Sequence, residues 1–268
     1  MTFDWAVEYL TSKGIEDARY SASEIFQEIG GVKATDLVLG KAESDNEEVI
    51  SAIIRRGERE PLQYIIGYTY FYRERYRVNK NCLIPRPDTE VLVEVAVKNI
   101  PAGESFMDLC SGSGCVGIST LKNTVGTQAV FADISSDAIE IAGENAKENG
   151  VFDRAKFCVM NLLETLPDGE FFAVLANPPY VTAEEYTTLS EEIHKEPKVA
   201  FVGGEDGSLF YKNLTPRLLP RIKKGGFIAY EIGYRQAELL RGIAKELLLE
   251  CEIIKDLSGN DRVAVLRP

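Results

Sequence analysis

The feature that most constrains this chain is the stretch at residues 171–180, which reads FFAVLANPPY. Its first six residues are all apolar, and a run of this length is typical of a central parallel strand buried on both faces. The run ends abruptly in the tetrapeptide Asn-Pro-Pro-Tyr. Ligands of open α/β sheets bind at the carboxyl ends of such strands. The stretch therefore predicts a buried parallel strand with a binding site at its end.

The tetrapeptide at residues 177–180 offers a narrow set of hydrogen-bonding groups. Its prolines lack backbone N–H donors and hold φ at about −65°, so Pro178 presents a carbonyl acceptor in a stiff turn. The Asn177 amide can accept and donate, and Tyr180 adds a flat aromatic face. Such a turn suits a planar –NH2 group, which would donate to both oxygens and stack on the ring. The alternative is an ordinary Asx-Pro turn with a surface tyrosine, but the full tetrapeptide after an apolar strand favours a site.

Alternating strands and helices over residues 91–268 predict an α/β domain with a doubly wound, mostly parallel sheet. The link between the last two strands is short, which predicts a terminal hairpin and therefore an antiparallel edge. Seven strands are expected, at residues 105–109, 128–132, 155–160, 171–176, 226–231, 251–255 and 262–266.

Residues 1–75 carry apolar side chains at helical spacing and predict a small N-terminal helical bundle. No titratable groups pair there in a catalytic way, so the bundle is either a substrate-recognition module or a packing appendage. Alternating apolar residues up to Val78 predict a hairpin, and residues 76–90 are assigned to the hairpin and linker before the sheet domain. The linker ends in PRPDTE at residues 85–90, where Asp88 or Thr89 could cap the helix that follows.

A glycine-rich turn follows the strand at residues 105–109, and glycines there would let a ligand approach the backbone closely. Read literally, Gly112, Gly114 and Gly117 match the dinucleotide-binding pattern, with Asp133 about 20 residues further on to accept hydrogen bonds from ribose hydroxyls. A nicotinamide oxidoreductase is therefore a competing interpretation. Asp108 argues against it, because a carboxylate at the strand end would attract the ammonium of an amino-acid-bearing cofactor and repel a pyrophosphate.

Charge and length narrow the function classes further. The chain has 268 residues and a net charge of −12. Nucleic acid normally requires a basic face, so we expect no direct nucleic-acid partner; basic proteins and small molecules suit an acidic surface better. No apolar run approaches the roughly 20 residues of a membrane span, and no signal peptide is apparent, so we expect a cytoplasmic protein that does not associate with membranes. We also expect a monomer.

The sequence offers little for metal or nucleophilic catalysis. Five cysteines are scattered without a C-x-x-C pair, and His194 is the only histidine. We therefore expect no metal site and no Ser-His or Cys-His device. His194 lies in a polar loop and is expected to be solvated, while Cys110 and Cys115 are expected to be packing residues.

Residues 108–114, Asp133 and the tetrapeptide at residues 177–180 resemble the class I S-adenosylmethionine-dependent methyltransferases that modify amide or exocyclic amino nitrogens. The segment PLQYIIG at residues 61–67, the PRPDTE motif and the N-terminal helices make the chain similar, over nearly its whole length, to the HemK/PrmC family of release-factor glutamine N5-methyltransferases. The tetrapeptide alone also fits adenine-N6 DNA methyltransferases, but the helical domain and the proline-rich motif separate the two. A cofactor-binding scaffold without methyl transfer is the non-enzymatic alternative.

The resemblance implies a Rossmann-like class I methyltransferase fold with a small N-terminal helical domain. It implies S-adenosyl-L-methionine as cofactor, S-adenosyl-L-homocysteine as product, and class 1 peptide chain release factors as partners, whose Gly-Gly-Gln loop provides the glutamine. The cofactor-binding residues that it implies are Asp108, Cys110, Ser111, Gly112, Ser113, Gly114, Asp133, Leu162 and Asn177. The catalytic and substrate-binding residues that it implies are Asn177, Pro178, Pro179 and Tyr180, with Phe71 closing the glutamine pocket.

One position departs from the pattern of this class, which usually has glycine where this chain has Cys110. If the turn requires a positive φ there, the cysteine costs stability or shifts the turn.

Overall fold

The structure is a computed structural model that describes residues 1–268, and the chain divides into two compact units. The first unit contains Met1–Tyr68 and Ser190–Glu196, and the second contains Thr69–Leu189 and Pro197–Pro268. The boundary between them thus lies at Tyr68, seven residues before the end of the expected bundle at residue 75. None of the helices is long and apolar enough to cross a membrane.

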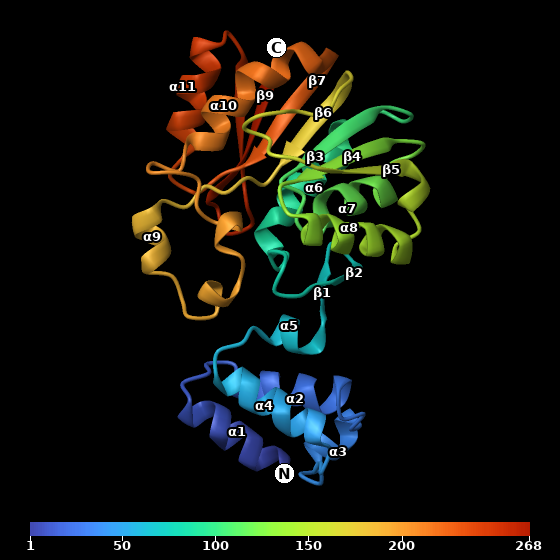
Figure 1. The fold of residues 1–268 in the computed structure, drawn as a ribbon, viewed down its shortest axis with the longest axis vertical. Coiled ribbons are helices and arrows are strands. Elements are labelled where there is room, and N and C mark those ends of the chain that lie inside the picture. Colours follow the sequence, from blue (N-terminus) through green and yellow to red (C-terminus); the bar gives the residue numbers. More distant parts are fainter. The chain divides into compact units, whose positions relative to one another are not determined.

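The first unit is a bundle of short helices (Figure 1). Its helices are α1 (Phe3–Ser12), α2 (Ala18–Glu28), α3 (Ala34–Val38), α4 (Glu47–Gly57) and α5 (Leu62–Ile66). The apolar faces of α1, α2 and α4 meet in one core that includes Leu10, Phe26 and Ile53, all fully buried. The side chains of Thr2 and Asn46 cap α1 and α4 by accepting hydrogen bonds from backbone N–H groups in the first turn.

A hairpin of strands β1 (Tyr68–Phe71) and β2 (Glu74–Arg77) follows the bundle. Tyr72 and Arg73 form its two-residue turn, and both have a positive φ. A two-residue turn of this kind matches the twist of the two strands that it joins. Phe71 and Tyr76 belong to the core of the second unit, and their ring centroids lie 6.0 Å apart. The hairpin therefore lies earlier than the assigned residues 76–90, and it is part of the sheet domain's core.

The second unit is built on a seven-stranded sheet of order β5-β4-β3-β6-β7-β9-β8. The strands are β3 (Ser105–Leu109), β4 (Gln128–Asp133), β5 (Ala155–Val159), β6 (Phe171–Ala176), β7 (Ile222–Glu231), β8 (Glu250–Lys255) and β9 (Asp261–Arg267). Strands β3 to β7 are parallel, and β9 runs antiparallel to both β7 and β8. The expected doubly wound sheet with an antiparallel edge is confirmed. The chain inserts β9 between β7 and β8, so that β8 forms the edge.

Helices cover both faces of this sheet (Figure 1). They are α6 (Glu90–Asn99), α7 (Cys115–Asn123) and α8 (Ser136–Glu148) on one face, and α10 (Leu209–Leu218) and α11 (Ala237–Glu246) on the other; the short helix α9 (Ala183–Thr187) lies in the loop after β6. Within β6, Ala173 and Leu175 pack on the first face and Val174 and Ala176 on the second, all fully buried. The central strand is thus buried on both faces, as its apolar run predicts.

Candidate active site

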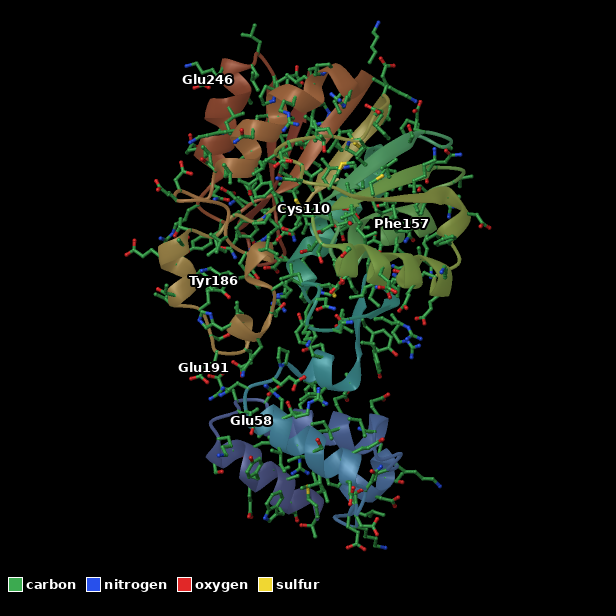
Figure 2. All side chains as sticks on the ribbon, viewed as in Figure 1. Glu58, Cys110, Phe157, Tyr186, Glu191 and Glu246 are labelled. Atoms are coloured by element: carbon green, nitrogen blue, oxygen red, sulfur yellow. The ribbon has the colours of Figure 1, made fainter.

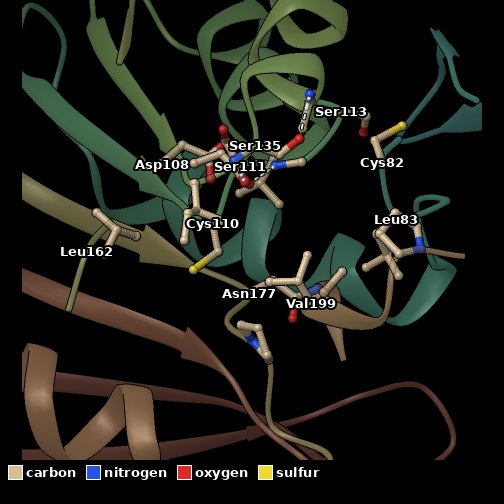
Figure 3. A pocket seen from close by; sticks show the side chains of 18 of the residues that line it. Cys82, Leu83, Asp108, Cys110, Ser111, Ser113, Ser135, Leu162, Asn177 and Val199 are labelled. Atoms are coloured by element: carbon tan, nitrogen blue, oxygen red, sulfur yellow. Dashed lines mark hydrogen bonds between the residues drawn. The ribbon is translucent and has the colours of Figure 1, made fainter. Parts of the chain in front are cut away.

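A cavity of about 290 Å³ lies at the carboxyl ends of β3, β4 and β6. Strand β3 starts the sheet, β4 and β5 extend it on one side and β6 and β7 on the other, so the cavity occupies the point where the strand order reverses. Figure 3 shows Asp108 and Ser111 on the side formed by the glycine-rich turn, with Asn177 across from them beside Val199. Two segments thus meet there that are some 70 residues apart in the sequence.

Asp108, the penultimate residue of β3, lines the cavity and is only 1% exposed. Its Oδ2 atom accepts a hydrogen bond of 2.8 Å from the backbone N–H of Gly117 in α7. Burial raises the pKa of this carboxyl to about 8, against the opposing effect of that hydrogen bond. A Cβ at Gly117 would lie 2.4 Å from the Phe131 ring and 2.8 Å from Asp108 Oδ2, so only glycine lets α7 approach the strand end this closely. A cation in the cavity would favour the ionised form of Asp108.

The turn after β3 holds three residues in the left-handed region, Cys110 (φ +57°), Gly112 (φ +52°) and Gly114 (φ +79°). The position of Cys110 therefore does require a positive φ, and the chain keeps the turn with a cysteine in place. The Cys110 side chain lines the cavity and is partly buried; Figure 2 labels it within the sheet domain. Burial raises the pKa of its thiol well above the ordinary value, which keeps it protonated and argues for a packing role.

Asp133 at the end of β4 ties the glycine-rich turn to the neighbouring strand. Its Oδ2 accepts from the Gly112 N–H at 2.9 Å, and its Oδ1 accepts from the Ser135 N–H at 3.0 Å. Burial raises the pKa of this carboxyl, and the backbone hydrogen bonds oppose the rise. Each carboxylate oxygen can accept more than one hydrogen bond, so Asp133 has capacity left for ligand hydroxyls. Leu162, 4% exposed, adds an apolar wall.

The tetrapeptide after β6 divides its side chains between the cavity and the protein interior. Asn177 and Pro179 line the cavity, and the Asn177 Nδ2 atom donates to the hydroxyl of Thr89 at 3.3 Å. Pro178 and Tyr180 do not line it. The Tyr180 hydroxyl donates instead to Glu231 Oε1 at 3.2 Å, and its ring packs against the core beneath α10 and α11. The structure therefore gives no stacking face of Tyr180 to a ligand in the cavity.

Two other predicted residues also lie outside the cavity lining. Phe71 is 2% exposed within the core and does not reach the cavity, so it does not close a pocket there. Gly114 is at the N-cap of α7, where an added Cβ would lie 3.0 Å from the Ala142 Cβ. The remaining cofactor-site candidates, Asp108, Cys110, Ser111, Gly112, Ser113, Asp133, Leu162 and Asn177, are brought together around one cavity.

A glycine-containing loop supports the tetrapeptide backbone to backbone. The Val181 N–H donates to the Phe201 carbonyl, and the Gly203 N–H donates to the Val181 carbonyl, both at 2.9 Å. A Cβ on Gly203 would lie 2.2 Å from the Pro179 oxygen, and one on Gly207 would lie 2.3 Å from the Tyr180 oxygen. From the sequence, these glycines indicate only a turn before a helix. The sequence signal that could have predicted the contact between these glycines and the tetrapeptide is their spacing after Asn-Pro-Pro-Tyr.

The PRPDTE segment contributes Thr89 to the site, although the sequence predicts a helix-capping role for this residue. Thr89 makes no side-chain cap of α6; its hydroxyl, 2% exposed, accepts from Asn177. Asp88 forms an ion pair with Arg262 at 3.1 Å, and Glu90 accepts from the Tyr72 N–H at 2.9 Å. The motif thus joins the hairpin, the final strand and the tetrapeptide around the cavity.

Two family models and several known proteins are similar to this chain. The model of the PrmC N-terminal domain matches residues 2–67, and that of the methyltransferase small domain matches residues 87–210. A release factor glutamine methyltransferase of Geobacter sulfurreducens is 34% identical over 97% of this chain and 93% of its own length, and one of Thermodesulfovibrio yellowstonii is 37% identical over 84% and 82%.

Among solved structures, the ribosomal protein L11 methylase of Lactobacillus delbrueckii subsp. bulgaricus superposes with a TM-score of 0.51 at 20% identity, covering 71% of this chain and 83% of that chain. This likeness concerns the fold of the sheet domain and agrees with the class I methyltransferase architecture. The identities over nearly full length go further: the chain belongs to the release factor glutamine methyltransferase family.

Proposed function

We propose that this chain binds S-adenosylmethionine in the cavity and transfers its methyl group to the side-chain amide nitrogen of the Gly-Gly-Gln glutamine of peptide chain release factors. The observation that carries the proposal is the pairing, within one cavity, of the buried carboxylate of Asp108 and the partly buried carboxylate of Asp133 with the amide of Asn177. The near full-length identity to release factor glutamine methyltransferases supports the same substrate.

The residues present fit the cofactor. Asp108 would accept from its ammonium group, Asp133 from its ribose hydroxyls, and Leu162 would contact the adenine. The buried hydroxyl oxygen of Ser111 lines the cavity and has no hydrogen-bond partner within the protein, so a ligand atom can satisfy it. The bound cofactor would supply the electrophilic methyl group.

The protein's own part in the reaction is alignment. An amide nitrogen is a poor nucleophile because its lone pair is delocalised into the carbonyl. The Asn177 Oδ1 atom would accept one N–H of the substrate amide at the cavity, and holding a group in an attack geometry can supply several kcal/mol. The Pro178 carbonyl, which lies outside the cavity lining, would accept the second N–H from a substrate that enters beside the turn. The same two oxygens would stabilise the positive charge that develops on nitrogen. Proton loss to solvent would follow methyl transfer, so no dedicated base is required.

The remaining predicted residues would then act indirectly. Pro179 forms part of the cavity wall, and Tyr180 anchors the turn from the interior through Glu231. The N-terminal unit would recognise the release factor; it contains no part of the cavity lining, and it exposes aromatic side chains such as Trp5 (47%) and Tyr20 (58%).

The test is incubation of the purified chain with methyl-labelled S-adenosylmethionine and a purified release factor, either intact or with its Gly-Gly-Gln glutamine replaced by alanine. We expect label in the intact factor only. Label in both factors would mean that the methyl acceptor is a residue other than this glutamine. Label in neither factor would contradict the proposed function.

A further inference from the structure

The side chain of Gln236, in the turn between β7 and α11, connects four segments of the sheet domain. Its Nε2 atom donates to the Tyr180 carbonyl at 3.1 Å and to the Gly207 carbonyl at 3.4 Å. Its Oε1 atom accepts from the Gly233 N–H at 2.9 Å and from the Tyr211 hydroxyl at 3.2 Å. A carboxamide offers two N–H donors and an oxygen with two lone pairs, so the hydrogen-bonding groups of this side chain are all used within the protein.

Three backbone groups fix the orientation of this carboxamide. A carbonyl oxygen can only accept and a backbone N–H can only donate, so Nε2 must face Tyr180 and Gly207 while Oε1 faces Gly233. A flipped side chain would set Oε1 against two carbonyl oxygens and Nε2 against an N–H. The packing is also close, because a Cβ on Gly207 would lie 2.8 Å from Gln236 Nε2 and 2.3 Å from the Tyr180 oxygen. Hydrogen bonds and shape thus specify the same arrangement.

We propose that Gln236 is a positioning residue for methyl transfer, which holds the Asn-Pro-Pro-Tyr turn in place through the carbonyl of Tyr180. Pro178 and Pro179 have φ held at about −65°, so the turn has little freedom to bend between its first and last residues. A displacement of the Tyr180 carbonyl is therefore transmitted to the Asn177 side chain, which lines the cavity. The inference rests on the proposed function, because Asn177 is the residue that would bind the substrate amide.

The peptide group that joins Tyr180 to Val181 is held from both sides. Its carbonyl accepts from Gln236 at 3.1 Å, and its N–H donates to the Phe201 carbonyl at 2.9 Å. The Tyr180 hydroxyl donates to Glu231 Oε1, which fixes the ring and leaves the main chain to the other two contacts. Of these two, the contact with Gln236 is made by a side chain, so a substitution can remove it.

Gln236→Glu keeps the size of the side chain but replaces the Nε2 donor by an oxygen that faces two carbonyl oxygens. We expect kcat for methylation of a release factor to fall by about tenfold to a hundredfold at about pH 8, with the Kd for S-adenosylmethionine within about threefold of wild type. The matched control is Gln128→Glu, the same substitution at the exposed first residue of β4, whose other end faces the cavity; it should change neither quantity. A wild-type kcat in Gln236→Glu would overturn the inference.

The pH profile separates loss of the donor from a general loss of structure. A protonated carboxyl can donate one hydrogen bond, so the kcat of Gln236→Glu relative to wild type should recover by about threefold or more between about pH 8 and about pH 6. The neighbouring Tyr211 hydroxyl stays protonated over this range, because burial raises its pKa well above the ordinary value.

Gln236→Met has a similar length and no donor at any pH, so its kcat relative to wild type should be reduced to the same extent at about pH 8 and should not recover. Equal pH profiles for the two variants would overturn the inference. Should Gln236→Glu fail to fold, Gln236→Met alone gives the test, and a wild-type kcat in Gln236→Met would also overturn the inference.

A second readout does not depend on the substrate. The Val181 N–H belongs to the peptide group that Gln236 holds, so its hydrogen exchange, followed by NMR, should be faster by about tenfold in Gln236→Glu. The N–H of Leu175, in the middle of the sheet, should exchange as in wild type. Unchanged exchange at Val181, or equal acceleration at both positions, would overturn the inference. Faster exchange at Val181 alone, in a protein that never methylates a release factor, would support it while the proposed function fails.

Discussion

Cys110 has a backbone φ of +57°, in the left-handed region that favours glycine, although cysteine carries a Cβ. The left-handed region costs an L residue about 1–2 kcal/mol, whereas glycine loses about 0.5–1 kcal/mol more backbone entropy on folding than alanine does. The steric cost is the larger of the two. The chain therefore carries a local strain at the edge of its own cavity.

Replacing Cys110 by glycine and by alanine isolates this strain, because both variants remove the thiol. We expect Cys110→Gly to have the higher free energy of unfolding, by about 0.5–1 kcal/mol, when both are measured by urea denaturation. An alanine variant that is the more stable of the two would mean that the turn relaxes to a negative φ.

Asp108 makes the stability of the free protein depend on pH. Its folded-state pKa of about 8 lies above the unfolded value, so its carboxyl is most favourable to folding when protonated, at low pH. That contribution is lost as the pH rises from about 4 to about 8, because the buried group must ionise. Asp108→Asn lacks the titration and can still accept from the Gly117 N–H.

We therefore expect Asp108→Asn to gain stability relative to wild type between pH 5 and pH 9, by on the order of a few kcal/mol, and to lose affinity for S-adenosylmethionine. Urea unfolding of both proteins at the two pH values, with isothermal titration of the cofactor, measures both effects. Parallel pH dependences of the two proteins would contradict the assignment of a strongly raised pKa.

At the scale of elements, the strands of the sheet domain are predictable from the sequence because most contain a short apolar run bounded by turn residues; β7 begins at Ile222, four residues before the expected strand at residues 226–231. The helices α3 and α5 are not, since five residues span too little of a helical period to show it. Leu62–Ile66 begins after Pro61 and ends at Gly67 in the left-handed region, and its tyrosine and isoleucines favour a strand locally. Tertiary packing decides its conformation.

The candidate site divides in the same way. Residues at strand ends, such as Asp108, Asp133 and Asn177, could be placed from the sequence, because parallel strands bring their carboxyl ends to one edge. The directions of Tyr180 and Phe71 could not, since a turn or a hairpin can send an aromatic ring to a cavity or to the core equally well. Glu231, the partner of Tyr180, is distant in the sequence, and Tyr76, the partner of Phe71, is one of several aromatic residues in the hairpin segment.

The loop at residues 203–207 determines how firmly the tetrapeptide is held. Gly203→Ala would place a Cβ about 2.2 Å from the Pro179 oxygen, so the loop or the turn must move. We expect kcat to fall by more than about tenfold, because a displacement of this size at a positioned group is costly. The control is Gly242→Ala in α11, where nothing lies within 4 Å; it should keep its activity and gain up to about 1 kcal/mol of stability. Full activity of Gly203→Ala would show that the contact does not position the turn.

For the whole molecule, the division at Tyr68 predicts which fragments fold. A fragment of residues 69–268 keeps Phe71 and Tyr76 in the core of the sheet domain, and a fragment of residues 76–268 loses Phe71. Removing a buried phenylalanine costs about 3–5 kcal/mol. We expect the longer fragment to unfold cooperatively and bind S-adenosylmethionine without methylating a release factor, and the shorter one to be markedly less stable in thermal denaturation. Methylation by the longer fragment at the wild-type rate would contradict a recognition role of the N-terminal unit.

In the proposed reaction, an acceptor at the tip of β6 aligns the substrate amide beside the methyl donor. The most direct measurement is the comparison of wild type and Asn177→Ala, with kcat determined for a release factor at saturating S-adenosylmethionine and the cofactor Kd determined separately. The account predicts that kcat falls by about a hundredfold or more while the cofactor Kd changes by less than about fivefold. Equal losses in kcat and in cofactor affinity, or an Asn177→Ala enzyme that methylates at the wild-type rate, would contradict it.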